Sequence, residues 1–240
     1  MRRGLITAAV AALALVASAA PAAARVERDP APVLLSGPHH TSYWQFVDRA
    51  VVARAAPSRS SGRVTTLGTR TPEGTANLVL SLARTTVRGT PWVEVRLGVL
   101  PDNSTGWVPR SALGGYNAVR THLFVSTSRM RLRLERVGKT VLRAPVGVGA
   151  ARSPTPTGQF FIRDRLTSVS SAYGPLAFGT SARSAVLTDW PGGGFIGVHG
   201  TNEPELIPGR ISHGCVRLHN ADILRLGRKL AIGTPVTITR

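Results

Sequence analysis

The sequence predicts a mostly β protein with a small barrel in its first half, a second β-rich domain after it, and a short helix near the C-terminus. In residues 43–115, short runs of β-forming residues alternate with turn clusters, a pattern typical of a small barrel. Residues 117–149 have the strand–turn–strand pattern of a meander, which suits an antiparallel sheet. Apolar residues at helical spacing follow residue 220. The 240 residues are sufficient for two domains with packed cores.

The first 24 residues have the three parts of a secretory signal peptide. Two arginines follow Met1, an apolar run covers Leu5–Val16, and the small residues Ala22–Ala24 offer a cleavage site. The apolar run is shorter than the ~20 residues that a membrane span needs, and no later stretch is long and apolar enough to cross a bilayer. We therefore expect residues 1–24 to be removed, and the protein to be secreted without a stable membrane span.

The segment after the signal peptide, residues 25–42, is rich in Pro, Ala and His and is expected to form a linker. His39 and His40 have no Cys or carboxylate at ligand spacing beside them, so we interpret them as ordinary loop residues. The first domain, residues 43–115, is expected to contain strands at 50–54, 63–67, 76–82 and 92–97.

Two short segments of this first domain resemble a bacterial SH3-like domain. The segment Gly106–Leu113 has the sequence GWVPRSAL, and Trp92–Val95 has the sequence WVEV. The resemblance implies a module that binds or positions other molecules, often components of the bacterial wall. A purely structural spacer is the alternative interpretation.

The second domain, residues 117–240, is expected to alternate strands with loops. Arg131–Glu135 alternates charged and apolar residues, which is the signal of a half-buried strand. Asn220 is expected to cap a helix that runs to about Leu230 and buries one apolar face. A largely polar segment, residues 166–181, contains Tyr173. Tyr173 is a candidate for lining a groove, and a packed surface aromatic is the alternative interpretation. The other expected strands are residues 123–126, 141–148, 159–163, 185–187, 195–199 and 235–239.

Residues 196–218, IGVHGTNEPELIPGRISHGCVRL, contain the protein's only cysteine, Cys215. His213 lies two residues before it and His199 sixteen residues before it. A free thiol has a pKa of about 8.5, so it needs a nearby base to react at neutral pH, and a histidine supplies one. A free thiol outside the cell is exposed to oxidation, so its presence favours a catalytic role over an inert buried cysteine.

The order and spacing of His199-Gly200-Thr201 and Ser212-His213-Gly214-Cys215-Val216-Arg217 resemble the L,D-transpeptidase catalytic domain of the YkuD type. The segment PTPTGQF at residues 154–160 resembles a turn of the same family. The resemblance covers residues 117–240, about half of the chain. It implies that Cys215 is the nucleophile, that His199 is its acid/base partner, and that the backbone carbonyl of Gly200 holds an imidazole in place.

The same resemblance implies a substrate and a reaction. The thiolate attacks a peptide carbonyl next to a D-configured centre in a peptidoglycan stem peptide, releases D-alanine and forms an acyl-enzyme. An amine from a neighbouring stem then resolves the acyl-enzyme and forms a cross-link. The implied partners are therefore stem peptides and the cell wall polymer, and the implied location is the cell wall or its surroundings.

Other residues of the motif have candidate roles. Residues two apart share a face on a strand but can diverge in a turn, so the sequence does not decide how His213 faces Cys215. We assign His213 a supporting, site-shaping role. We also expect the backbone N–H groups of His213, Gly214 and Cys215 to form an oxyanion hole. Arg217 is suited to a bidentate pair with a substrate carboxylate, although a structural or surface salt bridge explains it equally well. The substrate-binding candidates are Arg217, Tyr173 and Ser212.

Three alternatives compete with this interpretation. A zinc site built from His199, His213, Cys215 and His219 has the right number of ligands, but their spacing does not match a metal-finger pattern. We therefore expect no metal or cofactor. If water resolves the acyl-enzyme, the same residues make an L,D-carboxypeptidase, and the sequence does not separate the two outcomes. A non-catalytic wall-binding protein is disfavoured because Cys215 and His199 are intact.

The formal net charge is +18. Such a charge attracts polyanionic surfaces, including bacterial walls and nucleic acids. The arginines are scattered, without a basic run or a series of aromatic residues for base stacking, so no nucleic-acid partner is expected. We attribute most of the excess to a preference for arginine in an Ala- and Gly-rich chain.

Overall fold

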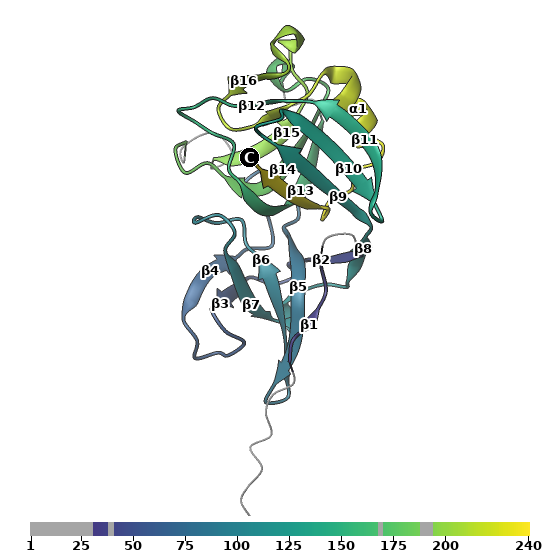
Figure 1. Ribbon diagram of the computed structural model, residues 1–240. Helices are drawn as coiled ribbons and strands as arrows, with labels where there is room; N and C mark the ends of the chain where they lie inside the picture. Colours follow the sequence, from purple (N-terminus) through teal and green to yellow (C-terminus); the bar gives the residue numbers. More distant parts are fainter. Residues whose placement is uncertain (1–30, 38–40, 168–169, 188–193) are drawn as a thin grey trace, which may run out of the picture.

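The computed structural model describes residues 31–37, 41–167, 170–187 and 194–240, which form two sheets that follow one another along the chain (Figure 1). The expected signal peptide, residues 25–30 of the expected linker, and His39 and His40 lie outside the described residues. The prediction of a mostly β protein is confirmed. No helix in the described ranges has the length and apolar character needed to cross a membrane.

The first sheet, which we call the N-terminal module, covers residues 33–119 and has eight strands. They run in the order β4-β3-β7-β6-β5-β2-β8, and β1 pairs with β5. The strand expected at residues 63–67 is confirmed, and those expected at 50–54, 76–82 and 92–97 differ only at their ends. The elements are β1 (Val33–Leu34), β2 (Ser42–Phe46), β3 (Val51–Arg54), β4 (Arg63–Leu67), β5 (Leu78–Val87), β6 (Thr90–Arg96), β7 (Thr105–Pro109), the 3-10 helix η1 (Arg110–Ala112) and β8 (Asn117–Val119).

Both boundaries of the module differ from the prediction. Strand β1 pairs with β5, and the Leu35 N–H donates to the Leu82 carbonyl at 2.8 Å. Residues 33–35 therefore belong to the module and not to a linker. Strand β8 pairs with β2, with Val119 opposite Ser42, although we expected it to open the second domain. Both boundaries of the module depend on pairing between strands that are distant in sequence. Local composition does not predict such pairing, so the boundaries could not be predicted from it.

The second sheet, which we call the C-terminal domain, has ten strands in the order β11-β10-β9-β18-β13-β14-β15-β17-β12-β16. Strands expected at 195–199 and 235–239 are confirmed. The strands are β9 (Thr121–Ser126), β10 (Arg131–Arg136), β11 (Lys139–Pro145), β12 (Gly147–Gly149), β13 (Gly158–Thr167), β14 (Leu176–Arg183), β15 (Phe195–His199), β16 (Gly209–Ser212), β17 (Val216–Arg217) and β18 (Pro235–Thr239), with the 3-10 helices η2 (Ser171–Tyr173) and η3 (Pro204–Leu206).

Strand β14 was not predicted, because its residues look like those of a polar segment. Its small hydroxyl residues are buried but satisfied. The Thr180 hydroxyl donates to the Ile196 carbonyl at 2.7 Å, and the Ser181 hydroxyl accepts from the Phe161 N–H at 3.1 Å. Buried polar groups with partners cost little, so these residues fit a central strand despite their composition.

The prediction of a strand at residues 185–187 is wrong. After β14 the chain turns instead, because the Ser184 hydroxyl accepts from the N–H groups of Val186 and Leu187 at 3.2 and 2.9 Å. A serine side chain that binds its own backbone two and three residues later stabilises a turn in place of a strand.

The expected helix is α1 (Asn220–Gly227), and it ends three residues before Leu230. Ile223 and Leu226 are fully buried, as the helical spacing predicted. The prediction that Asn220 caps the helix is wrong. The cap position is His219, without a side-chain cap hydrogen bond, and the Asn220 side chain binds elsewhere, as described below.

The two domains pack against each other through a shared apolar cluster. Phe161 of β13 is 2% exposed and joins four residues of the module. Beside this cluster, the Arg163 guanidinium pairs with Glu73 at 2.6 Å, and the Gln159 N–H donates to Asn103 Oδ1 at 2.6 Å. The module residues in the cluster are Trp44, Leu78, Leu80 and Val119.

Candidate active site

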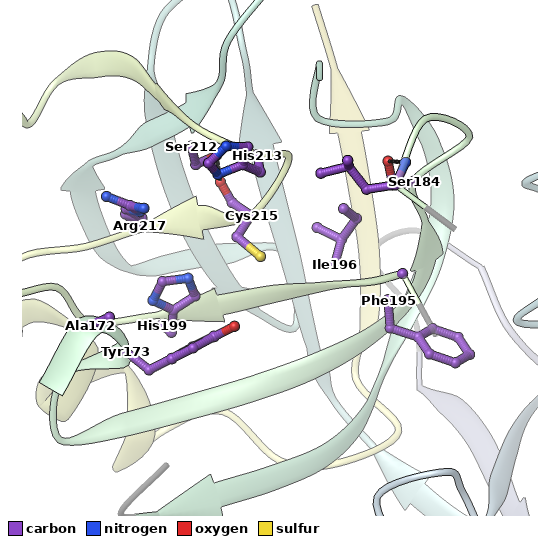
Figure 2. A pocket seen from close by; sticks show the side chains of 12 residues that line it. Ala172, Tyr173, Ser184, Phe195, Ile196, His199, Ser212, His213, Cys215 and Arg217 are labelled. Atoms are coloured by element: carbon purple, nitrogen blue, oxygen red, sulfur yellow. Dashed lines mark hydrogen bonds between the residues drawn. The ribbon is translucent and has the colours of Figure 1, made fainter. Parts of the chain in front are cut away.

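The histidines and the cysteine of the sequence motif line one pocket of the C-terminal domain. Strands β15 and β17 are parallel neighbours, and His199 lies opposite Arg217 in their register. Cys215 immediately precedes β17, so the sheet itself brings the cysteine next to the histidine. Figure 2 shows both side chains in a pocket of about 240 Å³. Its lining residues are Ala172, Tyr173, Ser184, Leu187, Gly194, Phe195, Ile196, His199, Ser212, His213, Cys215 and Arg217.

Gly197 of β15 lies between the side chains of Cys215 and His199. The Gly197 N–H donates to Cys215 Sγ at 3.3 Å. A β-carbon at position 197 would lie 3.5 Å from His199 Cδ2 and 3.8 Å from Cys215 Sγ. The thiol and the imidazole therefore flank the same backbone position, and the absence of a side chain there leaves the space between them open.

The imidazole of His199 is held in one orientation by its own turn. Its Nδ1 lies 2.5 Å from the Gly200 carbonyl oxygen. Because a carbonyl only accepts, Nδ1 carries the proton, and Nε2 of the neutral ring is an acceptor available to a thiol. The Tyr173 ring packs against the imidazole, with 4.5 Å between the ring centroids. The Gly200 carbonyl and the Tyr173 ring therefore hold the His199 imidazole in one orientation.

Burial keeps the thiol and the imidazole neutral in the resting protein. His199 is 3% exposed, and desolvation lowers its pKa from 6.5 to about 4, with the nearby Arg217 charge acting in the same direction and the Gly200 carbonyl opposing. Desolvation also raises the pKa of Cys215, while the Gly197 N–H and Arg217 oppose that shift. Both pKa shifts favour the uncharged forms of the thiol and the imidazole at neutral pH.

The turn before Cys215 is built from hydroxyl groups. The Ser212 hydroxyl donates to the Cys215 carbonyl at 2.6 Å and accepts from the Gly214 N–H at 3.1 Å. On the other side of the turn, the buried Thr155 hydroxyl donates to the Gly214 carbonyl and accepts from the Gly149 N–H, both at 2.8 Å. The Gly214 φ angle is +120°, a conformation that favours glycine. This network fixes the position of the cysteine.

The hydroxyl network corrects one expectation. The Gly214 N–H already donates to Ser212, so it is not available as a donor of the expected oxyanion hole. Ser212 lines the pocket, but both hydrogen bonds of its hydroxyl lie inside the turn. Its position in the structure is that of a residue which shapes the site.

His213 and Arg217 lie at the edge of the pocket. His213 is exposed, and Figure 2 places it next to Cys215 and Ser212. The Arg217 guanidinium pairs with the more exposed Glu203 at 2.7 Å. Arg217 therefore makes the salt bridge that was the alternative to substrate binding, while its side chain also faces the pocket.

The zinc alternative finds no support in the described ranges, where no group of three or more His, Cys, Asp or Glu side chains is placed to hold a metal. His219 does not line the pocket of Cys215. Its Nδ1 lies 3.8 Å from the Asp222 carboxylate at the start of α1 instead.

Asn220 is part of the site, although its sequence context predicted only a helix cap. Its Oδ1 accepts a hydrogen bond from the Thr201 N–H at 2.9 Å. The same oxygen lies so close to Gly200 and Gly174 that a β-carbon at either glycine would be 2.3 Å away. Asn220 therefore braces the turn that carries the Gly200 carbonyl. Its helix-capping preference concealed this role, because an Asn before an apolar helical pattern is usually a cap.

Residues 120–238 match the family model described as the L,D-transpeptidase catalytic domain, YkuD. The putative L,D-transpeptidase YkuD of Bacillus subtilis is 32% identical over 119 residues, which cover 50% of this chain and 66% of the relative. The protein of the same description from Bacillus licheniformis is 33% identical over 115 residues, covering 48% and 63%. The chain thus spans no more than 66% of the length of these curated relatives.

The solved structures similar to this chain include two L,D-transpeptidases. An L,D-transpeptidase from Mycobacterium tuberculosis is 18% identical, with a TM-score of 0.44 and coverage of 68% of this chain and 90% of that one. The catalytic domain of an L,D-transpeptidase from Enterococcus faecium is 22% identical, with a TM-score of 0.37 and coverage of 49% and 95%. The matched residues 120–238 include every residue that lines the Cys215 pocket, so this part of the chain is similar to the L,D-transpeptidase catalytic domain, YkuD.

Proposed function

We propose that the protein is a peptidoglycan L,D-transpeptidase that uses Cys215 as its nucleophile. The observation that carries this proposal is the shared pocket of Cys215 and His199, in which the Gly200 carbonyl leaves His199 Nε2 as an acceptor. The match of residues 120–238 to the L,D-transpeptidase catalytic domain supports the substrate class.

The first half-reaction forms an acyl-enzyme. Cys215 Sγ attacks the carbonyl carbon of the peptide bond before the terminal D-alanine of a donor stem, while His199 Nε2 takes the thiol proton. The imidazolium then gives that proton to the departing amine, the peptide C–N bond breaks, and D-alanine leaves. The donor remains bound to Cys215 as a thioester.

The second half-reaction transfers the donor to a neighbouring stem. An acceptor amine attacks the thioester carbonyl and loses a proton to His199 Nε2. The C–S bond breaks, a new peptide bond remains, and the sulfur regains its proton from the imidazolium. The protein itself is unchanged by the reaction, because the neutral Cys215 thiol and the neutral His199 imidazole are both restored.

The burial of the pair determines when charge forms. With the pKa of His199 lowered to about 4 and that of Cys215 raised, a separated thiolate–imidazolium pair is disfavoured before substrate binds. Proton transfer therefore accompanies attack on the carbonyl. Arg217 lies close enough to lower the pKa of both groups, so its charge favours the thiolate.

Three lining residues have proposed roles toward the substrate. Arg217 binds a stem carboxylate by exchanging it for the exposed Glu203 carboxylate, because a bidentate guanidinium pair suits either partner. Tyr173 covers one face of His199 and contacts the bound stem. Ser212 contributes through the turn that positions Cys215.

The reaction is tested by mass spectrometry of the products. Wild-type protein and Cys215→Ala are each incubated with a stem-peptide donor that ends in D-alanine and a second stem that carries a free amine. The proposal expects free D-alanine and a cross-linked dimer with the wild type only. Shortened peptide without dimer would assign the protein as an L,D-carboxypeptidase, and no product at all would reject both activities.

We also propose that the N-terminal module is an SH3-like unit and that the protein acts outside the cytoplasm. The proposal rests on the GWVPRSAL and WVEV segments and on the signal-peptide pattern of residues 1–24. Mass spectrometry of the protein recovered from its producing cells tests the export proposal. A mature N-terminus just after Ala24 supports export, and a cytoplasmic protein that retains Met1 contradicts it.

A further inference from the structure

Phe195, the first residue of β15, belongs to two hollows at once. It lines the pocket of Cys215 and His199, and it also lines a second hollow at the junction of the two domains. That hollow is bordered by residues of the module, among them Leu67, Arg96 and Gly98. The ring of Phe195 therefore lies between the active-site pocket and the N-terminal module.

Two guanidinium groups hold this ring. The Arg163 carbon Cζ lies 3.6 Å from the ring centroid, and that of Arg183 lies 4.8 Å away. A cation over the face of an aromatic ring is attracted by the ring's quadrupole, and the attraction increases when the pair is shielded from water. The Arg163 side chain is only 5% exposed, so it is a rigid support for the ring.

The module fixes each of these supports. The Arg163 guanidinium pairs with Glu73 of the module at 2.6 Å, and the backbone N–H of Arg183 donates to Asp102 Oδ1 at 3.0 Å. Gly98 meets the ring itself, because a β-carbon at this position would lie 3.1 Å from Phe195 Cε1. Three separate contacts thus connect the module to one wall of the pocket.

We propose that Phe195 is a specificity-determining residue for the donor stem, and that the N-terminal module acts as a positioning element that sets its ring. The Phe195 ring forms one end of the pocket that receives the donor stem next to Cys215. A shift of the Phe195 ring changes how the donor stem fits into the pocket. It leaves the Cys215 thiol and the His199 imidazole in place, together with the Gly200 carbonyl. This inference rests on the proposed transpeptidase function and gives the module a part in substrate selection.

Gly98→Ala tests the proposal from the module side. The added methyl group contacts the Phe195 ring at 3.1 Å and the Ser181 carbonyl oxygen at 3.5 Å, so the ring must move by a few tenths of an ångström. We expect the KM for the donor stem to rise about fivefold, below the ~100-fold effect of a ~1 Å misplacement, with kcat changed less than about twofold. Gly62→Ala is the matched control, because a β-carbon there meets no atom within 4 Å.

A double-mutant cycle shows whether the effect passes through the ring. In a Phe195→Leu background the aromatic edge that meets Gly98 is absent, so Gly98→Ala is expected to have no further effect on KM. Additive effects of the two substitutions would overturn the proposal. An unchanged KM in Gly98→Ala, equal to that of Gly62→Ala, would overturn it as well.

Labelling of the thiol separates this inference from the proposed function. The rate of Cys215 modification by a small alkylating reagent is expected to be equal in the wild type and Gly98→Ala, whereas a bulky peptide-based reagent is expected to react more slowly with Gly98→Ala. Equal rates with both reagents would contradict the role of Phe195. Absence of cross-linking by the wild type itself would instead reject the transpeptidase proposal.

Discussion

Asn220 and Thr201 are joined by a hydrogen bond that connects the helix after the cysteine to the turn after the histidine. Asn220 Oδ1 accepts from the Thr201 N–H at 2.9 Å. The contact holds the chain at Gly200, whose carbonyl determines which nitrogen of His199 carries the proton. Two segments of the motif that are distant in sequence are thus fixed relative to each other.

Replacement of Asn220 by alanine is expected to slow catalysis without weakening substrate binding. The Gly200 carbonyl loses its brace, so His199 spends less time with Nε2 aimed at the thiol. We expect kcat to fall about tenfold with little change in KM. Losses of this size are typical when a residue that helps to orient a functional histidine is removed. Steady-state kinetics measure the effect.

Two further variants make that test specific. Asn220→Asp keeps an acceptor for the Thr201 N–H and is expected to recover most of the lost kcat. Lys229→Ala alters an exposed residue just beyond the same helix and serves as the control. Equal activity of Asn220→Ala and Lys229→Ala would show that the brace has no role.

The two histidines of the motif are expected to differ strongly when removed. His199→Ala loses the general base, which is worth about 10²- to 10⁴-fold in rate, whereas His213→Ala removes an exposed side chain at the pocket edge and costs less than about tenfold. The rate of acyl-enzyme formation in a single turnover is the measurement. A larger loss of this rate in His213→Ala than in His199→Ala would show that His213 is the general base and His199 the supporting residue.

The pH dependence of the thiol follows from the burial of the pair. The pKa of His199 is lowered from 6.5 to about 4, so the base stays unprotonated, and acylation is expected to stay constant as the pH falls from about 7 to about 5. The pKa of Cys215 is raised, so in the absence of substrate its alkylation by iodoacetamide is expected to increase with pH throughout the neutral range. An alkylation rate that is flat across neutral pH would reveal a preformed thiolate–imidazolium pair instead.

Thr155 is expected to contribute to stability. Its buried hydroxyl joins the Gly149 N–H and the Gly214 carbonyl at 2.8 Å each. Thr155→Val keeps the shape of the side chain and leaves both buried groups without this partner, which costs about 1–3 kcal/mol. Denaturant unfolding measures the loss. Thr140→Val, at a half-buried position in β11, is the comparison, and an equal effect of both would contradict the structural role of Thr155.

Much of the fold could be predicted from residue patterns. Leu132 and Leu134 are buried in β10, as the alternation of Arg131–Glu135 predicted, although Glu135 is buried too. Pro235–Thr239 forms β18 with the predicted bounds. Strand β14 could not be predicted, because its buried hydroxyls depend on partners in other strands, such as the Ile196 carbonyl. A pattern in one segment carries no information about acceptors that another segment supplies.

The candidate site, like the fold, could be predicted only in part from the sequence. The pair proposed to carry the chemistry, Cys215 and His199, was predicted from residue types and spacing, and the structure places both residues in one pocket. Residues around this pair were assigned to other roles. Asn220 was assigned to a helix cap, because its partner, the Thr201 N–H, lies 19 residues earlier in the sequence. Gly214 was assigned to an oxyanion hole, because the sequence does not show that the turn directs its N–H to Ser212, two residues before it. The contact between Gly98 and Phe195 joins two domains and has no counterpart in local sequence.

The most direct test of the account is the mass of the protein itself shortly after mixing with a donor stem. We predict that the wild type gains the mass of the donor acyl group without its terminal D-alanine, located by peptide mapping at Cys215, and that Cys215→Ala gains nothing. Turnover of the donor by Cys215→Ala, or an acyl group found on any other residue, would contradict the account.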